Sequence, residues 1–241
     1  MSTRALERWL RCQSVTWLAL LTGIGLSVAF GVFEPRFLWG VLVTAVLSYA
    51  WLWRALAPRG TVADLATAGR FVALVGTLAW IALAEEISWL AWIALGAVVL
   101  SDLVDGWCAR RFGGSEEGAL LDMETDQLTT LVLSVLACSL FGAGLWCLFL
   151  PGVKYVFALA MLSAKTPAND PKPQEGNNLR GKLICALVMA LLLFALLPAS
   201  TELADGVRQL ATGTAVALLM YSFSADAIYL LSRVGRPSTV D

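Results

Sequence analysis

Long apolar runs separated by short polar segments dominate this chain. Runs of this kind predict membrane-spanning helices, because a helix needs about 20 mostly apolar residues to cross the hydrocarbon core of a bilayer. In chain order, the expected spans cover residues 14–33, 38–53, 71–84, 87–108, 119–141, 143–164, 183–199 and 209–231. The pattern therefore predicts an all-α membrane protein with about eight spans.

The first two runs form a separate preface to the rest of the chain. Residues 34–36, Glu-Pro-Arg, offer no small-residue cleavage site, so the first run is expected to be a retained helix and not a signal peptide. Residues 61–70 are too polar to span a bilayer and predict a short interfacial helix before the short span 71–84. The expected organisation is a two-helix preface (1–58), a catalytic transmembrane domain (59–236) and a tail (237–241).

Composition supports a membrane protein and removes several kinds of chemistry. The 241 residues are 59% hydrophobic, and the net charge of −1 implies no general affinity for nucleic acid. The chain has no histidine, which excludes His-based zinc sites, Ser-His-Asp triads and a histidine general base. The five cysteines form no C-x-x-C pair and are expected to be free thiols. Carboxylates are the remaining acid-base groups.

Basic residues predict the orientation. With the amino terminus inside, fourteen of the 17 basic residues lie on the cytoplasmic side. Arg36 and Arg208 lie outside, and Lys154 lies within a span. The segment between the spans 87–108 and 119–141 then faces the cytoplasm.

That segment concentrates acidic residues at helical spacing. Asp102 and Asp105 share one helical stripe, and Asp122 and Asp126 share a second one. Residues 111–117 are expected to form a tight turn, so that the two helices lie antiparallel with their acidic stripes facing. Four carboxylates in one pocket repel each other unless cations neutralise them, and oxygen ligands favour Mg²⁺, Mn²⁺ or Ca²⁺.

The same segment resembles the motif of the CDP-alcohol phosphotransferase family of integral-membrane enzymes, Asp-x2-Asp-Gly-x2-Ala-Arg-x8-Gly-x3-Asp-x3-Asp. All eight fixed residues are present, but seven residues separate Arg110 from Gly118 where the family has eight. Ser115 stands where many members carry Ser or Thr. Residues 61–70 are similar to the family's Asn-x2-Thr-x2-Arg segment, with Asp64 in place of Asn.

The resemblance implies a six-helix core that transfers a substituted phosphate group from a CDP-linked donor to an alcohol and releases CMP. It implies a pair of Mg²⁺ or Mn²⁺ ions, and Asp126 as the base. By this resemblance, the metal ligands are Asp102, Asp105, Asp122 and Asp126, and the nucleotide or diphosphate is held by Asp105, Gly106, Ala109, Arg110, Ser115 and Gly118. The expected donor is CDP-diacylglycerol, the acceptor a small polar alcohol, and the protein a homodimer in a bacterial inner membrane with its site facing the cytoplasm.

Several alternatives remain open at this level. One alternative is an enzyme whose donor is a CDP-amino-alcohol and whose acceptor is diacylglycerol. A second alternative, of a different class, is a divalent-cation transporter formed by the facing acidic helices. Lys154 either holds a phosphate of the acceptor or lipid, or extends to the membrane interface beside Tyr155. Arg180 and Lys182 weakly resemble a glycerophosphate-binding Gly-Lys. Glu124 lies about 200° around the helix from Asp122 and is expected to point away from the site.

Overall fold

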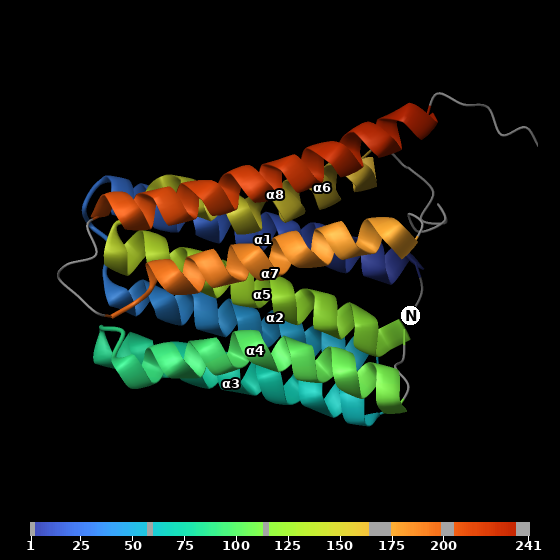
Figure 1. Ribbon diagram of the computed structural model, residues 1–241, viewed down its shortest axis with the longest axis horizontal. Coiled ribbons are helices and arrows are strands. Elements are labelled where there is room, and N and C mark those ends of the chain that lie inside the picture. The colour runs from blue at the N-terminus through green and yellow to red at the C-terminus, as the bar shows by residue number, and fades with distance from the viewer. Residues whose placement is uncertain (1–2, 57–59, 113–115, 164–174, 199–204, 235–241) are drawn as a thin grey trace, which may run out of the picture.

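The computed structural model describes residues 3–56, 60–112, 116–163, 175–198 and 205–234, and within them all regular structure is helical. The helices lie along one common direction, with connections at the two ends of the bundle (Figure 1). Their bounds are α1 (Thr3–Ala29), α2 (Leu38–Leu56), α3 (Val62–Ala84), α4 (Trp89–Phe112), α5 (Glu116–Phe141), α6 (Phe149–Ser163), α7 (Glu175–Ala195) and α8 (Asp205–Val234). Single 3₁₀ turns, η1 (Pro35–Phe37) and η2 (Leu145–Leu148), precede α2 and α6.

The all-α prediction is confirmed, and each expected run coincides with a helix. Three described segments are long and apolar enough to cross a membrane, namely Glu7–Ala29, Pro35–Leu56 and Val62–Ala84. Shorter apolar segments cover Trp89–Asp102, Leu145–Ala160 and Leu183–Ala195. The count of eight spans therefore stays a prediction.

Helix α3 differs from the expected pair of segments. Residues 61–70 and 71–84 form one continuous helix instead of an interfacial helix followed by a separate short span. Thr61 caps this helix, because its hydroxyl accepts from the Asp64 N–H at 3.2 Å and its own N–H donates to Asp64 Oδ2 at 3.0 Å. This reciprocal capping box satisfies two backbone donors that an α-helix start leaves without partners. Helix α3 therefore has 23 residues, where the expected span 71–84 has 14.

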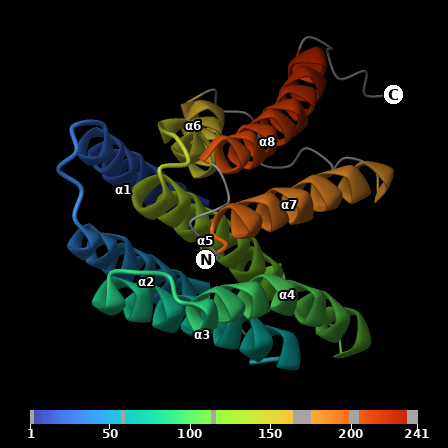
Figure 2. The ribbon, with the colours of Figure 1, turned by 60° about the vertical axis from the view of Figure 1, so that its left-hand side comes forward.

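Helix α5 occupies the middle of the bundle. Leu121, Leu128, Leu131 and Leu136 along it are almost completely buried. The helix contacts α1, α2, α3, α4, α6 and α7, while the most extensive pairings elsewhere are α3 with α4, α7 with α8, and α1 with α6 (Figure 2). The second half of the acidic motif is therefore carried by the most enclosed helix.

Polar contacts join the chain at the end of the bundle where α5 and α7 finish and α8 begins. Arg208 donates to the carbonyl oxygens of Ala195 at 3.0 Å and Leu197 at 3.2 Å, and its guanidinium lies 4.3 Å from the centre of the Phe141 ring. Thr212 donates to the Ala143 carbonyl oxygen at 3.0 Å. These bonds satisfy carbonyl groups at helix ends and tie the three helices together.

A glycine determines the turn after α5. Gly144 has φ 95°, and a Cβ atom there would lie 2.5 Å from the Trp146 ring. The Trp146 indole N–H in turn lies 3.2 Å from the Thr212 hydroxyl. Only glycine fits this conformation beside the indole, which brings η2 onto α8.

Candidate metal and phosphoryl-transfer site

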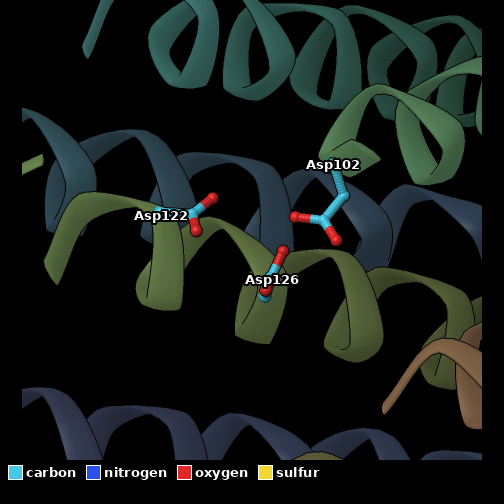
Figure 3. A group of neighbouring side chains, drawn as sticks. All are labelled: Asp102, Asp122 and Asp126. Atoms are coloured by element: carbon cyan, nitrogen blue, oxygen red, sulfur yellow. The ribbon is translucent and has the colours of Figure 1, made fainter. Parts of the chain in front are cut away.

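Three aspartates of the acidic motif converge between α4 and α5. One carboxylate oxygen from each of Asp102, Asp122 and Asp126 lies within 4.8 Å of the others, and the side chains point toward one another (Figure 3). Asp122 and Asp126 share a face of α5 because they are four residues apart. The prediction that acidic stripes on two helices face each other is confirmed for these three residues.

The cluster is partly open. The side chains of Asp102 and Asp122 are 44% and 40% exposed, and that of Asp126 is 29% exposed. A carboxylate with this exposure remains accessible to a cation from outside the protein, and Asp126 is the most enclosed of the three. The arrangement agrees with the expectation that Asp126 lies deepest in the site.

Arg70 on α3 forms the inner wall of the cluster. Its Nη1 donates to Asp102 Oδ1 at 2.7 Å, and its Nη2 lies 2.5 Å from Asp122 Oδ1 and 3.0 Å from Asp126 Oδ1. The Arg70 side chain is only 2% exposed. A planar guanidinium with a fixed fork of donors suits several carboxylates at once, which a lysine ammonium does not match.

Sequence reasoning did not place Arg70 in the site. It identified Arg70 as the end of an interfacial segment and as a marker of the cytoplasmic side. The spacing of Asp64, Thr67 and Arg70 was the available signal, since positions three residues apart share one helix face, and all three residues are buried. The helix start and the ion-pair centre thus lie on the same face of α3.

The described side chains fit a divalent cation. Three carboxylates and one guanidinium leave an excess of two negative charges, which one divalent cation balances. The donors are all oxygen, which favours Mg²⁺, Mn²⁺ or Ca²⁺ over softer metals. Two oxygens of the cluster are within hydrogen-bond distance of Arg70 Nη2, so a bound cation would share these carboxylates with Arg70.

Several predicted site residues have no described side-chain geometry. Asp105, Gly106, Ala109 and Arg110 lie in α4, and Arg180 and Lys182 lie in α7, but only their helical backbone is described. Ser115 lies outside the described residues. Gly118 is buried in the first turn of α5. The roles assigned to these residues stay predictions.

Glu124 and Lys154 pair with each other on the opposite side of α5. Lys154 Nζ donates to Glu124 Oε1 at 3.0 Å, and Gln13 Nε2 donates to Glu124 Oε2 at 3.0 Å. Glu124 thus points away from the aspartate cluster, as its helical position predicted. Lys154 is engaged in an ion pair, and its predicted contact with a substrate phosphate stays a prediction.

Comparison with known families accounts for the aspartate cluster. The family model for CDP-alcohol phosphatidyltransferase matches residues 60–222, which is 163 of the 241 residues. The chain belongs to the CDP-alcohol phosphatidyltransferase family. Comparisons with curated proteins and with solved structures gave no match. Members of this family are transferases of substituted phosphate groups, so the protein is an enzyme of that class.

The match begins just before α3 and ends within α8. It includes Arg70 and all three clustered aspartates, and α1 and α2 precede it. The apolar helices and the membrane-associated family together indicate an integral membrane protein.

Proposed function

We propose that the protein transfers a phosphatidyl group from CDP-diacylglycerol to the hydroxyl of a small polar alcohol and releases CMP. The convergence of Asp102, Asp122 and Asp126 inside the segment matched by the family supports this proposal most directly. The reaction would take place at the cytoplasmic side of a bacterial inner membrane and supply phospholipid synthesis.

The three clustered aspartates, together with Asp105, are proposed to hold two Mg²⁺ or Mn²⁺ ions. When bound, such an ion would neutralise charge on the diphosphate of the donor and on the departing CMP. The family motif further assigns the nucleotide and diphosphate to Gly106, Ala109, Arg110, Ser115 and Gly118. Arg70 would fix the positions of the metal-binding carboxylates, because it already contacts all three.

Asp126 is proposed as the group that takes the proton from the attacking hydroxyl. It is the most enclosed carboxylate of the cluster, and its Oδ1 lies 3.0 Å from Arg70 Nη2. One carboxylate oxygen held by Arg70 leaves the second oxygen for another partner. A general base must lie within hydrogen-bond reach of the proton that it removes, so the acceptor hydroxyl would approach this second oxygen.

Three basic residues are proposed for the part of the site that binds the acceptor or the lipid. Lys154, Arg180 and Lys182 are the proposed contacts to a phosphate of the acceptor or the lipid. A CDP-amino-alcohol donor with diacylglycerol as acceptor is the alternative within the family. Cation transport has less support, because Leu128, Leu131 and Leu136 fill the interior beyond Asp126 along α5. A homodimer is expected from the family resemblance.

The test is incubation of the full chain in detergent or nanodiscs with CDP-diacylglycerol and a panel of small alcohols. We expect CMP release together with a new phospholipid for one alcohol, both of them dependent on Mg²⁺ or Mn²⁺. Activity that persists in EDTA would contradict the metal-dependent chemistry. CMP formed only from a CDP-amino-alcohol in the presence of diacylglycerol would instead establish the alternative donor.

A further inference from the structure

A buried polar network joins α1 to the helix that carries two of the clustered aspartates. Glu124 on α5 is 2% exposed and accepts from both Gln13 on α1 and Lys154 on α6, each at 3.0 Å. The Gln13 bond is buried, and 111 residues separate its partners in the chain. Gln13 also lies outside the segment matched by the family, which begins at residue 60.

Glu124 lies opposite the aspartates on the same helix. At about 100° per residue, Asp122 and Asp126 point about 40° apart, and Glu124 lies about 180° from the direction midway between them. Rotation of α5 about its axis would therefore move Glu124 and the two aspartates together. The two faces of α5 have separate polar partners: Arg70 on the aspartate side, and Gln13 with Lys154 on the Glu124 side.

Apolar packing alone does not fix such a rotation well. Hydrophobic contact is non-directional, whereas a hydrogen bond weakens steeply away from its preferred geometry. The aliphatic side chains that bury α5 tolerate small rotations of the helix. The Glu124 carboxylate does not, because it accepts one hydrogen bond from α1 and another from α6, and a rotation would lengthen or bend both. A carboxylate buried in a membrane helix is also costly unless it is paired, so its placement here requires these partners.

We propose that Gln13, Glu124 and Lys154 are positioning residues that set the rotation of α5 and so aim Asp122 and Asp126 at Asp102 and Arg70. Helix α1 is then part of the catalytic unit, although it precedes the family segment. The predicted effect on metal binding and catalysis rests on the proposed function. The predicted approach of Asp122 and Asp126 to Asp102 does not depend on a metal. The alternative is a network that only satisfies its own buried groups and leaves the aspartates unaffected.

The first test measures Mn²⁺ binding by electron paramagnetic resonance on the full chain in nanodiscs. The variants are Gln13→Leu, Glu124→Gln and the double variant Glu124→Gln with Lys154→Met, which removes both charges of the ion pair and avoids leaving one of them unpaired. The control is Thr16→Val, one turn along α1, where an exposed hydroxyl donates only to the Cys12 carbonyl of its own helix. We expect at least fivefold weaker Mn²⁺ binding in the three network variants and no change in the control.

The second test reads the geometry without a metal. Asp102→Cys and Asp126→Cys are combined in a chain whose five native cysteines are replaced, and the two thiols are bridged with a short bis-methanethiosulfonate reagent. The parent carboxylates lie within 4.8 Å, so rapid bridging is expected with the network intact. We expect the bridging reaction to be at least threefold slower when Gln13→Leu, or the double variant Glu124→Gln with Lys154→Met, is added. With Thr16→Val, the rate should not change.

The two tests separate the failure of this inference from the failure of the proposed function. The inference is overturned if the double variant Glu124→Gln with Lys154→Met remains monodisperse and its thiols bridge at the rate of the unaltered network. The network then does not set the rotation of α5, whatever the result for Mn²⁺ binding. If the unaltered chain binds no Mn²⁺, the metal-dependent function fails, and slower bridging in the network variants still supports the positioning role. A network variant that is folded and binds Mn²⁺ as tightly as the unaltered chain also overturns the positioning role.

Discussion

Removal of the Arg70 guanidinium by Arg70→Met leaves three carboxylates without their shared counter-ion. At an effective dielectric constant of about 20, a unit positive and a unit negative charge at the 2.5–3.0 Å separations of the three Arg70–carboxylate pairs attract by about 6 kcal/mol, and all three attractions are lost with the guanidinium. Partial exposure of the carboxylates, 29% to 44%, screens this attraction to a fraction, about 1 kcal/mol for each pair. The metal-free protein should therefore lose about 3 kcal/mol, which lies at the low end for removal of one partner from a buried ion pair.

The loss should depend on divalent cations, because Mg²⁺ supplies the charge that Arg70 no longer does. For a chain of this size, about 3 kcal/mol corresponds to about 6–12 °C in Tm. We expect that shift in EDTA and a clearly smaller one in Mg²⁺, measured by thermal unfolding in detergent. The control is Arg111→Met, an exposed arginine in the last turn of α4. An equal loss in EDTA and in Mg²⁺ would refute the charge argument and leave Arg70 as a packing residue only.

Three further substitutions probe separate parts of the molecule. Asp122→Asn should weaken Mn²⁺ binding about tenfold while the fold persists, and unchanged affinity and turnover would remove Asp122 from the ligands. Asp126→Asn should still bind the nucleotide but reduce turnover at least about 100-fold, since a positioned base contributes 10²–10⁴; near-normal CMP release would reject it as the base. Arg208→Met should cost about 2–3 kcal/mol in thermal unfolding, because two carbonyl partners and a ring contact are lost, with Mn²⁺ affinity unchanged. A fall in Mn²⁺ affinity there would show that the two ends of the bundle are coupled.

The helices were predictable because their signals are local. Each apolar run corresponds to a helix, and polar or glycine-containing segments separate them. The continuity of α3 through residue 70 was not predictable from hydropathy, which treats Asp64 and Arg70 as polar interruptions. In the folded chain, Asp64 completes the capping box with Thr61 at the start of α3, and Arg70 is buried against aspartates, so neither residue ends the helix. The aspartates that make Arg70 compatible with burial lie 32 to 56 positions farther along the chain.

The aspartate cluster was predictable in part for a related reason. The spacing of Asp122 and Asp126 fixes their common face, and their approach to Asp102 follows from two helices running in opposite directions. Spacing also showed that Glu124 faces away. It did not show which residues would meet Glu124, because Gln13 and Lys154 belong to helices whose rotation the pattern leaves open. Contacts between distant helices depend on side-chain packing, which no single apolar run specifies.

The bonds of Arg208 and Thr212 make one end of the bundle a fixed pivot. Helix α8 has 30 residues, and at 1.5 Å per residue it is about 45 Å long. A tilt of only about 5° about that pivot displaces the other end of such a helix by about 4 Å, close to the width of a hydrocarbon chain. A rigid tilt of α8 about this end would therefore move its far end by several ångströms while Arg208 and Thr212 stay close to their carbonyl partners.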